Sequence, residues 1–445
     1  MGVYAARLVR CASLFFILDL ITNTVSGRET SPLAAPSLLW ANVLDQNVTF
    51  SDPCLLSVRF PSEKQQLAAA LAVMTWDHTA TTTQIVVLSL SHGTVLWRRR
   101  FETQLQPYSG WCVPGRPEGA LLNAGDFLFC GATWGVAAFD PSSDPSSPPA
   151  WEYRTDAGGG SGVPAHPTFM DGRIYFTFEN GHRSSPMFVL NATTGALLYS
   201  SGDERAFTLI WPVQAAMAVA YCGYHPADRN AVHDAAVDNP NITLTVRDAT
   251  TGSILWQKHG LRSSNPGMWD NPNLDVDATG ETILMYSKPH AQLRLMNAFL
   301  SRSGRELDWQ VTSRGSVADY DTYAYEGHFY RLVTVDPMSM AVEKYSLFDN
   351  SSIWSETFLN ADNGSILLVG SGCAFSFELN GGVVTAFDAR DGTTLWSIVD
   401  VTLPSTGITS VLQAPHPGGG DSARVSVLFF GHSNGTFTAA VCRSV

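Results

Sequence analysis

The sequence predicts an all-β protein in which four-stranded antiparallel sheets repeat around a ring, that is, a β-propeller. Three observations lead to this fold: abundant turn formers, a hairpin motif that recurs about every fifty residues, and complementary strand fragments at the two ends of the chain. The 445 residues include 37 glycines and 24 prolines, and 45% of them are hydrophobic. Such a chain can bury a sizeable core, which excludes a disordered protein.

The first segment is typical of a signal peptide. Arg7 and Arg10 precede an apolar run of about eleven residues, Cys11–Ile21, whereas a membrane-spanning helix needs roughly 20. Small residues follow the run up to position 27, so we expect cleavage there, although Asp19 within the run leaves an uncleaved signal as the alternative.

This assignment divides the chain into residues 1–26, the signal peptide, and residues 27–445, the propeller. We expect a secreted or secretory-pathway lumenal protein with no membrane span in the mature chain. With 27 basic and 40 acidic residues, the net charge of −13 repels phosphate backbones, which argues against nucleic-acid binding. Sequons for N-glycosylation agree with secretion; they occur at Asn47, Asn191, Asn241, Asn350, Asn363 and Asn434.

The repeat is clearest in two segments, Leu244–Trp256 and Val384–Trp396, which align without a gap so that Asp248 matches Asp388 and the tryptophans match. An alternating apolar strand ends at Asp or Asn, a short turn with a glycine follows, and a second strand closes on a large aromatic residue. This pattern predicts a β-hairpin. A second hairpin precedes most copies, for example at His166–Phe178, so each unit has four strands, and such units must pack face to face to bury both surfaces.

Counting the closing aromatics predicts the number of blades. The residues in this register are Trp40, Trp97, Trp151, Tyr199, Trp256, Trp309, Tyr345 and Trp396. Trp40 has no hairpin before it in the mature chain, whereas three strands near the C-terminus lack a closing aromatic. We therefore expect the strand Leu38–Val43 to complete the last blade, which closes an eight-bladed ring without a free edge. The short step of 36 residues from Trp309 to Tyr345 keeps seven blades as the alternative.

The frame apolar-x-apolar-Asp-x-x-x-Gly-x-apolar-apolar-Trp resembles the repeat of the pyrroloquinoline quinone (PQQ)-like propellers, which include quinoprotein alcohol dehydrogenases and non-enzymatic eight-bladed scaffolds. The resemblance covers nearly the whole mature chain. It implies that the repeated aromatics dock between adjacent blades. It also raises the possibility of PQQ chemistry, but the dehydrogenases hold PQQ between a tryptophan and two adjacent half-cystines, with calcium nearby, and this sequence has no adjacent cysteines.

Ring closure also suggests disulfides among the six cysteines beyond the signal peptide. Cys112 and Cys130 flank one strand-turn-strand and form the expected pair. Cys54 and Cys442 would meet where the ends of the chain join, and Cys222 and Cys373 remain by subtraction.

No catalytic, cofactor-binding or metal motif stands out, so we expect none of these sites and no cofactor. The sequence favours a non-catalytic propeller that binds a protein, peptide or glycan on one face. A PQQ- and calcium-dependent oxidoreductase and a lumenal quality-control or stress-sensor domain are the alternatives.

Overall fold

The structure is a computed structural model of the chain. It describes residues 37–44, 48–50, 54–59, 67–77, 82–101, 112–116, 125–155, 165–178, 185–206, 210–224, 242–261, 273–276, 280–287, 295–307, 319–325, 327–336, 339–347, 351–359, 365–370, 372–378, 383–399, 408–415, 424–431 and 436–442. These residues are almost entirely strands, with one 3-10 turn, η2 (Gln214–Ala216).

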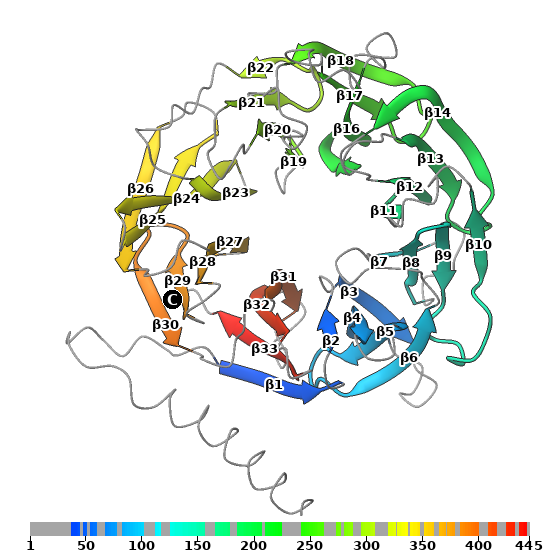
Figure 1. Cartoon of the computed structure of the whole chain (residues 1–445), viewed down its shortest axis with the longest axis horizontal. Coiled ribbons are helices and arrows are strands. Elements are labelled where there is room, and N and C mark those ends of the chain that lie inside the picture. The colour runs from blue at the N-terminus through cyan, green and yellow to red at the C-terminus, as the bar shows by residue number, and fades with distance from the viewer. Residues whose placement is uncertain are drawn as a thin grey trace, which may run out of the picture.

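The strands stand around a central axis as sheets that follow one another in chain order (Figure 1). We number the strand groups as units. Unit 1 holds β2 (Val48–Phe50), β3 (Cys54–Arg59), β4 (Leu67–Asp77), β5 (Thr82–Ser89) and β6 (Val95–Phe101). Unit 2 holds β7 (Cys112–Gly115), β8 (Phe127–Ala132), β9 (Gly135–Phe139) and β10 (Trp151–Arg154). Unit 3 holds β11 (Ala165–Met170), β12 (Arg173–Phe178), β13 (Ser185–Asn191) and β14 (Leu197–Ala206).

The second half of the ring repeats this arrangement. Unit 4 holds β15 (Trp211–Val213), β16 (Ala218–Tyr224), β17 (Ile242–Asp248) and β18 (Ile254–Leu261). Unit 5 holds β19 (Asn273–Val276), β20 (Thr282–Ser287), β21 (Leu295–Leu300) and β22 (Glu306–Leu307). Unit 6 holds β23 (Asp319–Tyr325), β24 (His328–Asp336), β25 (Ser339–Ser346) and β26 (Ser352–Leu359). Unit 7 holds β27 (Ser365–Gly370), β28 (Cys373–Glu378), β29 (Val383–Asp388) and β30 (Thr394–Val399).

The closing unit joins the two ends of the chain. It holds β31 (Ile408–Pro415), β32 (Arg424–Gly431), β33 (Thr436–Cys442) and, as its outer strand, β1 (Ser37–Val43). β1 pairs antiparallel with β33, with Ser37 opposite Val441 and Trp40 opposite Ala439. The expected closure by an N-terminal strand is therefore confirmed, and the β-propeller fold with it.

The units correspond to seven hydrogen-bonded sheets, because units 3 and 4 share one sheet of eight strands. The link is short: Arg205 and Ala206 at the end of β14 pair with Tyr224 and Gly223 of β16. The described strands thus form seven sheets by hydrogen bonding and eight groups by chain order, and the number of blades stays a prediction.

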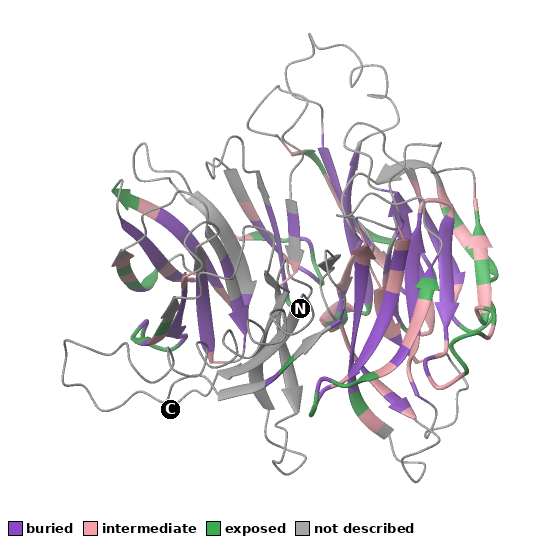
Figure 2. Ribbon diagram, turned by 60° about the horizontal axis from the view of Figure 1, so that its bottom comes forward, coloured by how far each residue is buried: buried purple, intermediate pink, exposed green. Residues whose placement is uncertain are grey.

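The apolar core lies between neighbouring units and not within any one of them (Figure 2). One cluster joins Ile85 and Trp97 of unit 1 to Leu128 and Phe139 of unit 2, and further clusters fill each junction up to that of units 6 and 7. Each sheet buries both faces only through its neighbours, which is why the repeats must stack.

The turn between the third and fourth strands is set by the repeated Asp/Asn and glycine. In unit 4, Asp248 Oδ1 accepts hydrogen bonds from the amides of Thr250 (2.9 Å) and Thr251 (2.6 Å), and Gly252 N donates to Asp248 O (2.9 Å). Gly252 has a φ of +72°, a conformation that glycine adopts without a Cβ clash. The same backbone bond from the turn glycine recurs in units 1, 3, 5 and 7, where Gly93, Gly195, Gly304 and Gly392 each donate to the residue four positions earlier.

Candidate functional site

The aromatic residues of the repeat form the joints between units. In four joints the indole Nε1 of one unit donates to the carbonyl oxygen three residues before the turn glycine of the next unit. These bonds are Trp40 to Leu90 (2.8 Å), Trp151 to Ala192 (2.9 Å), Trp256 to Ser301 (2.7 Å) and Trp354 to Ala389 (3.2 Å). The rings lie directly on the glycines: a Cβ built on Gly93 would come within 2.4 Å of Trp40. Glycine is therefore required by close approach as well as by φ.

The joint between units 3 and 4 uses different hydrogen bonds, because Tyr199 takes the place of the tryptophan. Its ring covers Gly252, but its hydroxyl is buried with no hydrogen-bond partner in the described residues. The carbonyl oxygen of Ala249 instead accepts a hydrogen bond from the hydroxyl of Tyr175, on the second strand of unit 3. Burial holds the pKa of Tyr175 above its usual range, so the phenol stays a donor.

The structure corrects one of the aromatic assignments. Tyr345 lies on the third strand of unit 6, and the residue on the outer strand that covers Gly392 is Trp354. The turn before the outer strand of unit 6 follows β25, after Tyr345, so Tyr345 precedes this turn and does not close the unit. With Trp354 in the register, the 36-residue step disappears.

The other aromatics in the register are placed less uniformly. Trp97 is buried at the junction of units 1 and 2, where its ring lies 6.4 Å from that of Phe139. Its Nε1 has no hydrogen-bond partner among the described residues. Unit 2 lacks the turn glycine of the other joints, and its third strand is followed instead by the loop 140–150. Trp396 packs 6.0 Å from Phe375, and Trp309 lies outside the described residues.

The cysteines agree with the sequence in one pair and differ in the others. Cys112 and Cys130, directly opposite on β7 and β8, form a disulfide. Cys54 and Cys222 carry no disulfide, so the pairs Cys54–Cys442 and Cys222–Cys373 are wrong. The positions explain this: Cys54 on β3 faces unit 2, and Cys222 is enclosed in the cluster between units 4 and 5.

These two thiols are poorly suited to catalysis. Burial, together with the nearby carboxylate of Asp126, raises the pKa of Cys54 to about 12, and burial raises that of Cys222 further. Because the thiolate is the nucleophile, both cysteines are inert near neutral pH.

Of the six sequons only Asn191 lies in the described residues; Asn47, Asn241, Asn350, Asn363 and Asn434 fall outside them. Asn191 is partly exposed, and its Oδ1 accepts hydrogen bonds from the amides of Thr193 (2.9 Å) and Thr194 (3.0 Å). Its glycosylation, like that of the others, stays a prediction.

Two polar clusters occupy opposite faces of unit 6, and the sequence did not reveal either. Arg331, which is 5% exposed, donates from Nε to Glu343 Oε2 (2.6 Å) and from Nη2 to the Tyr345 hydroxyl (2.9 Å). On the other face, Lys344 Nζ donates to the carbonyl oxygen of Ala389 in unit 7 (2.7 Å). Alternation along β25 sends adjacent residues to the two faces. Every charged group is satisfied within its cluster, which indicates a structural role.

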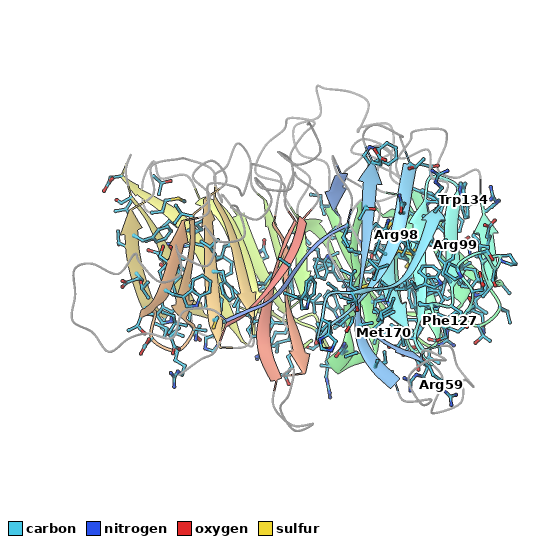
Figure 3. The ribbon with its side chains drawn as sticks, turned by 90° about the horizontal axis from the view of Figure 1, so that it is seen from below. Arg59, Arg98, Arg99, Phe127, Trp134 and Met170 are labelled. Carbon is cyan, nitrogen blue, oxygen red and sulfur yellow. A yellow bond between two sulfur atoms is a disulfide. The ribbon has the colours of Figure 1, made fainter. Side chains whose placement is uncertain are left out.

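A run of arginines covers the outer strand of unit 1. The guanidinium of Arg98 donates to the carbonyl oxygen of Leu44 (3.0 Å), Arg99 lies 4.9 Å from the ring centre of Phe139, and Arg154 of β10 lies 4.1 Å from that of Trp134. Figure 3 shows Arg98, Arg99 and Trp134 in the same part of the ring. Charge on an outer strand opposes the addition of a further strand, so this edge is protected.

The outer strands of units 3 and 4 expose apolar side chains in place of charged ones. Each begins with two exposed apolar residues, and together they form what we call the apolar rim: Leu197 (46% exposed), Leu198 (46%), Ile254 (45%) and Leu255 (44%). The packing of Tyr199 on Gly252 brings the starts of the two strands together. In unit 7 the equivalent residue, Leu395, is only 5% exposed, so the repeat itself does not require this exposure.

The described residues do not fit the PQQ site of the dehydrogenases. They include no group of three or more His, Cys, Asp or Glu side chains placed to hold a metal ion, and the sequence has no adjacent cysteines to stack on the cofactor. In the same residues, no helix has the length and apolar character to cross a membrane.

No protein-family model matches the sequence, and no curated protein matches it either. Solved structures do match in shape. BamB from Moraxella catarrhalis is 12% identical with a TM-score of 0.52, and the match covers 93% of this chain and 99% of that one. A europium-containing methanol dehydrogenase is 12% identical with a TM-score of 0.54, covering 88% and 85%. Sqt1 from Saccharomyces cerevisiae is 11% identical with a TM-score of 0.58, covering 92% and 100%.

These likenesses establish the fold. Together with the sequence repeat, they show that the chain has the PQQ-like β-propeller fold. The fold occurs in proteins named as dehydrogenases and in others whose names state no reaction, so the fold alone assigns no activity.

Proposed function

We propose that the chain is a secreted or lumenal, non-catalytic propeller that binds a protein or peptide partner through the apolar rim. The single observation that carries the proposal is the exposure of Leu198 and Leu255. Both occupy the position that is buried in unit 7, and the packing of Tyr199 on Gly252 joins the strands that carry them. Exposed apolar residues gathered in one part of a surface are characteristic of interaction sites. The same chemistry favours a protein or peptide over a glycan, which is recognised mainly through polar groups.

The surroundings of the rim support this assignment. The turn threonines Thr193 and Thr251 are exposed beside the apolar pairs, which gives the rim a polar border. By contrast, the polar clusters of unit 6 are enclosed and mutually hydrogen-bonded, and offer a ligand no free group.

The test compares the wild-type protein with two double variants. Leu198→Glu with Leu255→Glu places charge on the rim, and Val335→Glu with Ile353→Glu is the matched control at apolar residues of unit 6 that are 50% and 43% exposed. Each immobilised protein is incubated with secretory-fraction proteins, and captured proteins are identified by mass spectrometry. We expect a protein retained by the wild type and the control and lost from the rim variant. Equal retention by all three would refute the role of the rim.

The quinoprotein alternative is tested separately. PQQ and calcium added to the purified protein should give neither a bound chromophore nor a rise in melting temperature. A stable coloured complex would favour the oxidoreductase.

A further inference from the structure

Cys373 is disulfide-bonded, but its partner is not among the side chains that the structure describes. Cys112 and Cys130 bond to each other, and Cys54 and Cys222 carry no disulfide. Of the seven cysteines in the chain, only Cys11 and Cys442 remain as partners.

The repeat geometry decides between these two. Cys373 begins the second strand of unit 7 and pairs with Asp388, the last residue of the third strand. In unit 3 the residue in this position is Arg173, which begins β12 and pairs with Asn191, the last residue of β13. Cys373 and Arg173 are therefore equivalent positions of the repeat.

The contacts on either side of Arg173 show what this position faces. The hydroxyl of Tyr175, two residues after Arg173, donates to the carbonyl oxygen of Ala249, which directly follows Asp248 in the next unit of the ring. Thr250 Oγ1 also donates to Asp171 Oδ2 (3.2 Å), two residues before Arg173. Asp248 is the last residue of the third strand of unit 4. The start of a second strand thus lies near the end of the third strand in the following unit.

In the unit that follows Cys373, the last residue of the third strand is Cys442. It ends β33, where it pairs with Ser426 near the start of β32. Unit 7 and the closing unit are in contact, since β27 packs against β31. Cys11, in contrast, lies in the expected signal peptide.

We propose that Cys373 and Cys442 form a disulfide that bonds unit 7 covalently to the closing unit. The hydrogen bonds between β1 and β33 close the ring on one side of β33, and the disulfide fixes the end of the same strand on the other. Formation requires an external disulfide as oxidant: the two thiols give up their protons and two electrons, the S–S bond forms, and the oxidant is reduced to two thiols. This covalent bond between unit 7 and the closing unit therefore forms only in an oxidising compartment.

Peptide mapping without reduction tests the bond directly. After enzymatic removal of N-glycans, trypsin releases Cys373 in residues 345–390 and Cys442 in residues 425–443. We expect these peptides as one linked species that separates on reduction. Alkylation of Cys442 in the denatured, unreduced protein, or a link from Cys373 to another cysteine, would overturn the proposal.

Substitutions distinguish the loss of this disulfide from the loss of either cysteine side chain by itself. Cys373→Ser, Cys442→Ser and the double variant should lower the melting temperature by the same amount, because each removes one shared bond. Cys222→Ser, at a buried cysteine that carries no disulfide, is the matched control and should leave the linked peptide intact. A double variant whose loss equals the sum of the two single losses would contradict a shared bond. None of these outcomes depends on partner binding at the apolar rim.

Discussion

The joint between units 3 and 4 offers a test of how the ring is held together. Four joints use an indole Nε1 to satisfy a carbonyl oxygen of the next unit, whereas here Tyr175 serves Ala249 while Tyr199 covers the glycine. Ala249 is fully buried, so removing the Tyr175 hydroxyl leaves a buried acceptor without its donor. Such a group costs about 1–3 kcal/mol, and we expect Tyr175→Phe to lower the free energy of unfolding by that amount.

The compensating change follows from the other joints. Tyr199→Trp supplies an Nε1 in the position from which Trp151 and Trp256 donate. We expect this substitution to restore most of the lost stability in the Tyr175→Phe background. In the wild-type background it has little to add, because Ala249 already has a donor. The two sites should therefore show a coupling free energy of about 1 kcal/mol or more in a double-mutant cycle.

Equilibrium urea unfolding, followed by tryptophan fluorescence and by circular dichroism, measures these quantities. Tyr153→Phe is the matched control, because no described residue hydrogen-bonds to the Tyr153 hydroxyl at the neighbouring joint. A Tyr175→Phe variant as stable as this control, or additive effects of the two substitutions, would show that the hydrogen bond to Ala249 does not hold the joint.

Three further predictions concern closure, the turn glycines and pH. Deleting residues 27–45 removes β1, so the whole ring should melt at a lower temperature in one cooperative transition; an unchanged melting curve would contradict closure by β1. Gly93→Ala places a Cβ against Trp40 and should lower the free energy of unfolding in urea by about 2–4 kcal/mol. The control Gly260→Ala, at a similar positive φ with no atom within 4 Å, should lower it by only about 1 kcal/mol. Equal losses would show that contact with Trp40 is unimportant. Hydrogen bonds from Arg390 hold the pKa of Asp388 below its usual range. The contribution of Asp388 to the free energy of unfolding is therefore present above about pH 4 and is lost as the pH falls through the lower folded-state pKa. Asp388→Asn should make the free energy of unfolding depend less on pH over this acidic range, and an unchanged pH profile would count against the interaction.

Much of the fold follows from local sequence patterns. Asp248 and Gly252 specify a hairpin turn through contacts within five residues, and the same contacts recur at Asp388 and Gly392. The closing strand was also predictable, because a lone Leu-Trp ending at the N-terminus and three strands at the C-terminus complete one unit. The expected strand Leu38–Val43 differs from β1 by one residue.

The errors arose where a residue's partner lies on another unit. Tyr345 has the size of a closing aromatic, but its strand is followed by another turn and strand, and only packing shows that Trp354 covers Gly392. Ring closure suggested the pair Cys54–Cys442, and subtraction suggested Cys222–Cys373. Cys54 instead faces unit 2, whose two cysteines bond to each other, and Cys222 is enclosed between units 4 and 5. The buried contact of Lys344 with the carbonyl oxygen of Ala389 in unit 7 left no periodic signal in the sequence.

The sequence by itself therefore determined the strand units, their turns and the closure of the ring, because these depend on alternation, turn chemistry and chain order. Only the tertiary structure decided which side chains meet between units and which apolar residues stay exposed. Leu255 and Leu395 have the same place in the repeat, yet one lies on the surface and the other is buried. Burial depends on the neighbouring sheet, whose distance and side chains the local pattern does not encode.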